Sequence, residues 1–408
     1  MGETHKICLI SPDFIPVWSG IGAYTVTFLE QIPKDVEIHL VTVKRKIPKI
    51  DLSLQTTSSE VLDKIKERVN IYYISEASNT FSYNLAFQLS CLKKIPSLCK
   101  KENLQLVHSN FPLMSDIYVK LFNRIRIPTL TTVQSTIDGQ HKGVFQSGLG
   151  LSSLETSDLA NLLLYQPLRL LELLYMSTTP YYIAISESII NELHKYFGVE
   201  RKQIRLIYHG VNTDRFSPPT KNLYLKYYRP IVLFTGRFVA TKGIDVLIKA
   251  IPEVLKNFRD TLFLFVGGGN YEPYLELLKR LRIPKQNYLF KGYVDFFDMP
   301  SLYKAATIYV APTIYEPLGI RVIEAMSCEK PVIASKVGGI PEIIDHGKNG
   351  YLVPPLNHKA ISDHIKILLA DNKLAEQVGK QARKKVLEKF SAEEMIKRTV
   401  DLYKHLLR

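Results

Sequence analysis

Residues 231–243 read IVLFTGRFVATKG, an apolar run followed by a loop that carries two glycines and two cations. A helical pattern begins at about Ile244. A short buried run that ends at a glycine and leads into a helix is typical of a strand in a parallel sheet. In such sheets ligands lie beyond the carboxyl ends of the strands, so we expect a ligand at the loop that begins at Gly236.

Similar apolar runs alternate with helical patterns on both sides of this unit. They lie at Ile7–Ser11, Glu37–Val43, Leu106–His108, Thr129–Val133, Tyr182–Ile185, Leu262–Val266, Tyr288–Phe290, Ile308–Val310 and Val332–Ala334. Strands separated by helices indicate parallel sheets. We therefore predict an α/β protein with two Rossmann-like, doubly wound domains, residues 1–210 and 230–390. A linker at 211–229 joins them, and a capping box at Ser391-Ala-Glu-Glu394 predicts a last helix over 391–408.

Composition narrows the class of protein. The 408 residues are 46% hydrophobic and 23% charged, which excludes a disordered or collagen-like chain. The four cysteines form no CxxC pair, so neither a zinc site nor a disulfide framework is predicted, and a reducing, cytoplasmic setting is expected. The first residues lack an apolar stretch long enough for a signal peptide, so we do not expect a secreted protein. The most apolar segment, 159–176, is interrupted by polar residues and predicts a buried or interfacial helix rather than a membrane span.

The formal net charge is +14. No concentrated basic stripe interleaved with aromatic residues is present in the sequence, so no nucleic-acid partner is predicted. The surplus favours anionic ligands such as nucleotide phosphates, or contact with an anionic membrane surface.

Two loops could bind phosphate. Gly20 and Gly22 follow the first predicted strand and lead into a helix, where backbone N–H groups can approach an anion closely. A plain glycine turn is the alternative, and the GxGxxG spacing of an NAD site is absent. In the loop after 231–235, Arg237 and Lys242 could bind a diphosphate from two sides. The alternative is that they are two solvated surface charges.

Two carboxylates follow the strand at 308–310. Glu316 lies just before a helix expected to start near Gly319, whose free N–H groups would face the same region as Arg237. Glu324 lies further along this helix, where a carboxylate could accept two hydrogen bonds from a ribose diol.

Together these motifs resemble those of a known family. They are Gly20-Ile-Gly22, His209-Gly-Val-Asn-Thr-Asp214-Arg-Phe216, Gly236-Arg237 with Lys242-Gly243, Glu316-Pro-Leu-Gly319, Glu324-Ala-Met326 and Gly338-Gly339-Ile-Pro-Glu342. The set resembles the retaining, nucleotide-sugar-dependent glycosyltransferases of the GT-B fold, family GT4, also called glycosyl transferases group 1. The resemblance covers most of the chain and is strongest from about residue 205 to 355.

The resemblance implies two domains that face a cleft, and a last helix at 391–408 that crosses back onto the first domain. It implies transfer of a hexose-type sugar from a UDP- or GDP-linked donor to a hydroxyl of a glycan, lipid-linked or small acceptor. It also implies that no metal and no cofactor beyond the donor is needed. Attack would come from the face that the leaving group vacates, and the leaving phosphate would take the acceptor proton.

The resemblance also implies roles for single residues. Arg237 and Lys242 would neutralise the donor diphosphate, Glu324 would bind the ribose, and Glu316 would contact the donor sugar. Gly20 and Gly22 would close over the phosphate, the helix end at Gly319 would face it, and backbone near Tyr293 and Val294 would meet the base.

The chain departs from the family pattern at Gln134, where the family commonly has a histidine that contacts the donor sugar. A glutamine can hydrogen-bond a hydroxyl but cannot carry a proton. His108, at another strand end, is a second candidate on the sugar or acceptor side, with a structural role as the alternative.

Two other functions fit the same motifs. One is a nucleotide- or sugar-binding protein of the GT-B fold that has lost turnover, and the other is a GT-B nucleotide-sugar epimerase or a phosphorylase. A lipid-linked acceptor at the cytoplasmic face of a membrane is a hypothesis that rests on the basic charge and on segment 159–176.

Overall fold

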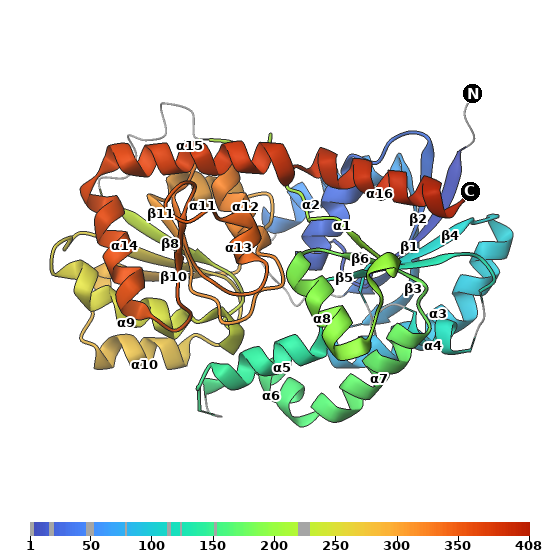
Figure 1. Cartoon of the computed structure of the whole chain (residues 1–408), viewed down its shortest axis with the longest axis horizontal. Helices are drawn as coiled ribbons and strands as arrows, with labels where there is room; N and C mark the ends of the chain where they lie inside the picture. The colour runs from blue at the N-terminus through green and yellow to red at the C-terminus, as the bar shows by residue number, and fades with distance from the viewer. Residues whose placement is uncertain are drawn as a thin grey trace. The chain divides into compact units, whose positions relative to one another are not determined.

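The computed structural model describes residues 4–15, 20–45, 53–77, 80–111, 116–122, 125–150, 153–218 and 229–408. It contains two compact units, each a parallel sheet flanked by helices (Figure 1). The first unit comprises Met1–Thr136, Gln166–Gly210 and Ala392–Arg408, and the second comprises Ile137–Tyr165 and Val211–Ser391. Residues 16–19 of the first glycine loop and residues 219–228 of the predicted linker lie outside the described part.

The first unit is built on a seven-stranded sheet of order β3-β2-β1-β4-β5-β6-β7. Its strands are β1 (His5–Ile10), β2 (Val36–Arg45), β3 (Val69–Ala77), β4 (Leu106–Ser109), β5 (Thr129–Val133), β6 (Tyr181–Ala184) and β7 (Ile204–Leu206). Its helices are α1 (Gly20–Glu30), α2 (Ser53–Lys66), α3 (Thr80–Lys101), α4 (Ile117–Leu121), α7 (Tyr165–Ser177), α8 (Glu187–Phe197) and α16 (Ala392–Leu406). Helix α1 begins at Gly20, earlier than the sequence pattern predicts, so both glycines lie in its first turn.

The second unit is built on a six-stranded sheet of order β10-β9-β8-β11-β12-β13. Its strands are β8 (Ile231–Thr235), β9 (Leu262–Val266), β10 (Tyr288–Gly292), β11 (Ile308–Ala311), β12 (Val332–Ser335) and β13 (Tyr351–Val353). Its helices are α5 (Ile137–Gln146), α6 (Thr156–Leu163), α9 (Ile244–Leu255), α10 (Glu272–Arg280), α11 (Met299–Ala305), α12 (Ile320–Ser327), α13 (Ile340–Ile343), α14 (His358–Ala370) and α15 (Asn372–Lys389).

The strand pairs within each sheet are parallel, which confirms the predicted fold class. All five residues of β8 are buried, because β8 is central in its sheet and helices cover both of its faces. Helix α9 contributes a fully buried side of Leu247, Ile248 and Ile251 to the core of this unit. Burial on both faces of the strand therefore explains why the run at 231–235 is continuously apolar.

Two segments differ from the sequence-based predictions. Residues 137–165 group with the second unit, although the sequence places them in the domain at 1–210, because side chains of α6 bond to the loops after β8 and β9. The apolar segment 159–176 is broken between α6 and α7, and it exposes several leucines. Among the described residues, none of the helices is both long and apolar enough to cross a bilayer.

Candidate active site

The loops after β8 and β11 meet at an ion pair. Lys242 Nζ lies 2.6 Å from Glu316 Oε2, and the two side chains are 26% and 17% exposed. Because β8 and β11 are neighbours in the sheet, their carboxyl ends bring together residues that lie 74 positions apart. The Ile314 N–H also donates to the Thr241 carbonyl over 2.8 Å, which fastens one loop to the other.

The backbone of Glu316 is held by the predicted glycine pair. The Gly339 N–H donates to the Glu316 carbonyl over 3.1 Å. Gly338 has φ +51°, and a Cβ there would lie 1.8 Å from the Glu316 carbonyl oxygen. Only glycine permits this approach, so the glycine pair fixes the position of Glu316.

Helix α12 begins beside this carboxylate. It starts at Ile320 after Gly319, whose φ is +116° and which provides no side-chain cap. The first N–H groups of the helix are therefore open to an anion, which the helix dipole favours.

Glu324 lies inside α12 and is 1% exposed. Arg321 Nη1 donates to both of its carboxylate oxygens, over 2.9 and 2.8 Å, and the Tyr303 hydroxyl donates over 2.6 Å. Burial and the adjacent Glu324 raise the pKa of Tyr303 well above its ordinary value, so the phenol stays a proton donor. A carboxylate has about four acceptor positions, and these bonds fill three of them.

Arg237 is exposed, and its Nη2 donates to the Ser157 hydroxyl over 3.0 Å. Two acidic residues of the same helix turn hold the backbone nearby. Asp158 Oδ2 accepts from the Ala240 N–H over 3.0 Å, and Glu155 Oε1 accepts from the Asn270 N–H. Helix α6 therefore supports the loop that carries Arg237 and leaves other donors of its guanidinium available to an anion.

Tyr293 and Val294 directly follow β10, at the same edge of the sheet. The Tyr293 side chain is exposed and Val294 is half-buried. An exposed aromatic ring at this edge suits stacking on a nucleobase.

In the first unit, His108 and Gln134 differ in how fully their side chains are hydrogen-bonded. His108 is fully buried, with Nδ1 2.6 Å from the Tyr403 hydroxyl and Nε2 2.7 Å from the Thr132 hydroxyl. Burial, and to a smaller extent Lys120, lowers the pKa of His108 to about 3. Neither ring nitrogen is left for a sugar hydroxyl. Gln134 directly follows β5, and its Nε2 donates to Asn110 Oδ1 over 2.9 Å.

Several residues that bond to the predicted site side chains could not be predicted from the sequence. Ser157 and Asp158 lie far from Arg237 along the chain, and Tyr303 lies on a different helix from Glu324. Only Arg321 has a local signal, because its spacing of three residues from Glu324 puts both on one helix face.

Among the described residues, no group of three or more histidine, cysteine, aspartate or glutamate side chains is arranged to hold a metal ion. The four cysteines, Cys8, Cys91, Cys99 and Cys328, are buried and form no disulfide.

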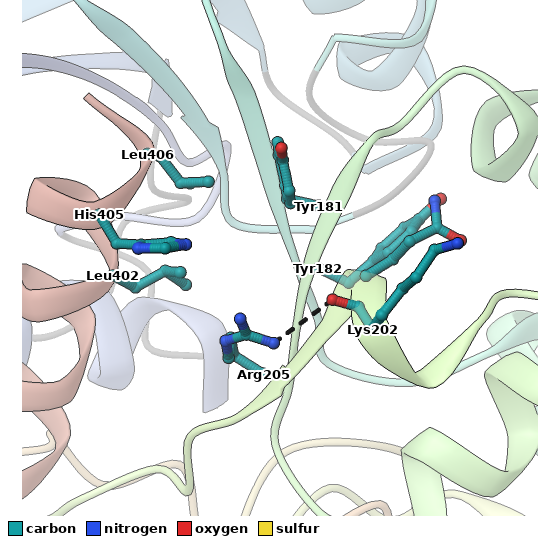
Figure 2. Close-up of a pocket in the computed structure, with 8 residues that line it drawn as sticks. Tyr181, Tyr182, Lys202, Arg205, Leu402, His405 and Leu406 are labelled. Atoms are coloured by element: carbon teal, nitrogen blue, oxygen red, sulfur yellow. Dashed lines mark hydrogen bonds between the residues drawn. The ribbon is translucent and has the colours of Figure 1, made fainter. Parts of the chain in front are cut away.

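A small cavity in the first unit lies away from this chemistry. It holds about 20 Å³ and is lined by Tyr181, Lys202 and Arg205 on one side and by Leu402, His405 and Leu406 of α16 on the other (Figure 2). Tyr181 begins β6, and Lys202 lies before β7. The cavity is therefore at the amino-terminal edge of the sheet, opposite the edge where ligands bind, and has room for about one water molecule.

Comparison with known proteins decides the family. Residues 18–215 match the family Glycosyltransferase Family 4, and residues 222–385 match Glycosyl transferases group 1. The chain belongs to glycosyltransferase family 4. This confirms the resemblance seen in the motifs, and the family 4 enzyme has the GT-B fold and uses nucleotide sugars.

Individual relatives agree with this assignment. This chain is 27% identical to an uncharacterized glycosyltransferase of Methanocaldococcus jannaschii over 346 residues. The aligned region covers 82% of this chain and 84% of that protein. Its fold is similar to that of sucrose-phosphate synthase from Thermosynechococcus elongatus, with a TM-score of 0.76 and 23% identity over 98% of this chain and 99% of that one. It is also similar to Anabaena HepE in complex with UDP-glucose, with a TM-score of 0.72 and 16% identity over 99% and 100%.

Proposed function

We propose that this glycosyltransferase moves a hexose-type sugar from a UDP- or GDP-linked donor to an acceptor hydroxyl, with retention of the anomeric configuration. The observation that carries the proposal is the 2.6 Å pair of Lys242 and Glu316, beside the uncapped start of α12. A cation and a carboxylate side by side at a ligand-binding edge suit a leaving diphosphate and the sugar attached to it. The solved HepE complex holds UDP-glucose, which supports a uridine donor.

In this proposal the diphosphate is stabilised by fixed positive groups. Arg237 supplies a bidentate fork, Lys242 a point charge and α12 its N–H groups, all aimed where negative charge develops as the bond to the sugar breaks. Lys242 would then exchange its bond with Glu316 for a phosphate oxygen. This charge balance requires no metal ion.

Glu316, released from Lys242, would orient the donor sugar. In the transfer step, the bond between the anomeric carbon and the diphosphate oxygen breaks, the acceptor oxygen bonds to that carbon on the same face, and the acceptor proton passes to the diphosphate. Glu316 forms no covalent bond in this scheme. Glu324 would accept a ribose hydroxyl at its fourth acceptor position, with Arg321 and Tyr303 holding the carboxylate in place.

The first experiment measures which nucleotide sugar binds and whether it is consumed. Thermal-shift assays with UDP-glucose, UDP-N-acetylglucosamine, GDP-mannose and ADP-glucose should show one donor that raises the melting temperature, because binding to the folded state stabilises it. Consumption is then followed with and without an acceptor panel. A binding protein consumes none of them, and an epimerase needs no acceptor. Either result would reject the proposed transferase.

Arg237→Ala and Lys242→Ala should each reduce turnover by about a hundredfold, which is the loss seen when one preorganised charge donor is removed. Lys249→Ala is the matched control, because Lys249 also pairs with a carboxylate, Asp245, but on helix α9. Steady-state kinetics on folded variants make the measurement. Normal turnover by Arg237→Ala and Lys242→Ala would place the diphosphate elsewhere.

Product NMR on wild type and Glu316→Gln tests the mechanism. The glutamine keeps an acceptor oxygen, so transfer should fall but persist, with the donor's anomeric configuration kept. An inverted product from the wild type contradicts retention. Restoration of the variant by azide, with an inverted product, would show that Glu316 is a covalent nucleophile.

For the acceptor, we propose a hydroxyl of a lipid-linked glycan at the cytoplasmic face of an anionic membrane. Helix α7 exposes Leu170, Leu173 and Leu174, by 57%, 42% and 42%, and the net charge of +14 favours an anionic surface. Flotation with phosphatidylglycerol vesicles should capture the wild type, and replacement of the three leucines by serine should abolish capture. Absence of wild-type flotation would contradict membrane contact.

A further inference from the structure

A turn at residues 212–216 contacts the two helices that carry Tyr303 and Glu324. It forms the end of the motif that begins at His209, and it contains none of the residues assigned to the donor. The turn, Tyr303 and Glu324 all belong to the second unit. The Phe216 N–H donates to the Asn212 carbonyl over 2.9 Å, which closes the turn, and the Phe216 side chain is buried.

The backbone of Phe216 is fastened to the end of α12. The Ser327 hydroxyl donates to the Phe216 carbonyl over 2.6 Å, and Ser327 is the last residue of α12. Arg383 Nη1 of α15 donates to the same carbonyl over 3.2 Å and to the Ser327 carbonyl over 2.5 Å. The last carbonyls of a helix lack partners within it, so Arg383 satisfies one of them and complements the helix dipole. Phe216 is therefore held at a fixed place beside α12.

The ring of Phe216 packs against α11. Its centroid lies 6.0 Å from that of the Tyr303 ring, in a T-shaped arrangement with an angle of 63° between the planes. Tyr303 is fully buried, its hydroxyl donates to Glu324 Oε2 over 2.6 Å, and the Thr235 hydroxyl lies 3.0 Å from the same oxygen. Phe216 therefore contacts α12 through its carbonyl and α11 through its ring.

This packing controls the bond between Tyr303 and Glu324. Protein interiors are close-packed, so a smaller side chain at position 216 would leave space into which the Tyr303 ring can shift. A hydrogen bond weakens when its distance and angle depart from their preferred values. Glu324 would then keep Arg321 as its partner but lose the bond from Tyr303 that fixes its second direction.

We propose that Phe216 is a positioning residue for the nucleoside of the donor: by holding Tyr303 against Glu324, it keeps that carboxylate oriented toward the ribose hydroxyls. This inference rests on the proposed function and deepens it, because it assigns the ribose selectivity of the site to a residue that does not touch the donor. The ligand class that it favours is a ribonucleoside diphosphate, over one whose sugar lacks the 2′ and 3′ hydroxyls.

The test compares the affinities of UDP with 2′,3′-dideoxy-UDP and of GDP with 2′,3′-dideoxy-GDP by isothermal titration calorimetry. The wild type should bind the ribonucleotide of one pair about tenfold more tightly than its dideoxy form, the size of a hydrogen bond to a charged group. Phe216→Leu should reduce this ratio to about threefold or less. Its affinity for the dideoxy form should not change, because base and diphosphate are the same. Equal affinities in the wild type, or a full ratio in Phe216→Leu, would overturn the proposal.

Tyr303→Phe removes the hydroxyl but keeps the ring beside Phe216. It should reduce the ratio at least as much as Phe216→Leu does. The double variant should be no worse than Tyr303→Phe, because Phe216 acts through that hydroxyl. Additive losses of the ratio in this double-mutant cycle would contradict the proposed action through Tyr303.

Phe263→Leu is the matched control, because Phe263 of β9 is also a fully buried phenylalanine of the second unit, in the core that includes α9. Both Phe→Leu variants should lower the melting temperature, but Phe263→Leu should keep the full ratio. If Phe263→Leu reduced the ratio as much as Phe216→Leu, the effect of Phe216 would be one of stability alone, and the proposal would fall.

Crystal structures of the unliganded variants test the positioning without any nucleotide. In Phe216→Leu the Tyr303 hydroxyl should lie beyond hydrogen-bond distance of Glu324, and in Phe263→Leu it should stay at 2.6 Å. An unchanged distance in Phe216→Leu would overturn the proposal. If the wild type binds neither UDP nor GDP, the ribose selectivity falls with the proposed function, while the crystal structures still decide whether Phe216 positions Tyr303 and Glu324.

Discussion

Gly338 shows how one backbone position fixes the loop that carries a charged side chain, Glu316. Gly338→Ala would place a Cβ 1.8 Å from the Glu316 carbonyl oxygen, so the loop that carries Glu316 must move. We expect at least a tenfold loss of turnover together with a lower melting temperature. Gly347→Ala is the control, because Gly347 also has a positive φ, +77°, but open space around its Cα. It should cost about 1 to 2 kcal/mol of left-handed strain and keep full activity. Equal activity losses in both variants would contradict this role.

His209 gives a prediction about pH. It is buried against the Tyr24 ring, with centroids 4.4 Å apart, and its Nε2 has no hydrogen-bond partner among the described residues. Burial lowers the pKa of His209 to about 3 from its ordinary 6.5. Between pH 3 and pH 6.5, His209 therefore binds a proton in the unfolded chain but stays neutral in the folded chain. The free energy of unfolding therefore falls by about 1.4 kcal/mol for each pH unit below about 6.5.

His209→Phe keeps the ring stack and removes the titration. Urea unfolding at pH 7.5, 6.5 and 5.5 measures how the free energy of unfolding changes with pH. Below pH 6.5 this free energy should fall less steeply in the variant, by about 1.4 kcal/mol per pH unit, which corresponds to one proton. Burial also lowers the pKa of His108 to about 3, so His108 adds the same pH dependence to the stability of both proteins. The difference between them therefore reports on His209 alone. Identical pH slopes for wild type and variant would contradict the lowered pKa of His209, because they would mean that it binds a proton equally well in the folded and the unfolded chain.

Two glycines allow helix α5 to pack closely against Tyr315. Gly139 and Gly143 lie against the ring of Tyr315, the residue before Glu316, and a Cβ on Gly143 would lie 2.5 Å from the Tyr315 Cβ. The backbone of Tyr315 cannot yield easily, so Gly143→Ala should push α5 away from the Glu316 loop and lower turnover several-fold. Gly150→Ala, in open space in the same segment, should have no effect. Kinetics on both variants make the comparison, and an active Gly143→Ala enzyme would show that this packing does not matter for transfer.

The last helix of the chain, α16, belongs to the first unit. Tyr403 of α16 bonds to His108, and Lys404 forms a 2.7 Å ion pair with Asp35. Removal of residues 392–408 should therefore unfold β4 and β5 while β8 and β11 stay protected, as measured by hydrogen exchange, because the second unit keeps its own core.

Lys404→Ala is the control for this truncation. The ion pair is solvent-exposed, so its loss should cost about 1 kcal/mol or less. Uniform loss of protection over both units in the truncated chain would contradict the assignment of α16 to the first unit alone.

The fold class could be predicted from local pattern because most strands are buried on both faces and appear as continuous apolar runs. The strands that the pattern does not predict, β3, β7 and β13, all lie at the edge of a sheet. An edge strand is covered less completely, so its sequence mixes polar and apolar residues. Strands β7 and β13 are also only three residues long, too short for a recognisable period.

The strand pattern was enough to predict that Arg237, Lys242, Glu316 and Glu324 lie at one edge of the second sheet, because parallel strands place the loops at their carboxyl ends on the same edge. The pattern did not predict the hydrogen-bond partners of the site side chains. Ser157 beside Arg237, Tyr303 beside Glu324 and Asn110 beside Gln134 come from segments far apart in the chain. These contacts become visible in the folded chain alone, because a hydrogen bond depends on distance and direction in space, which a residue's place along the chain does not record.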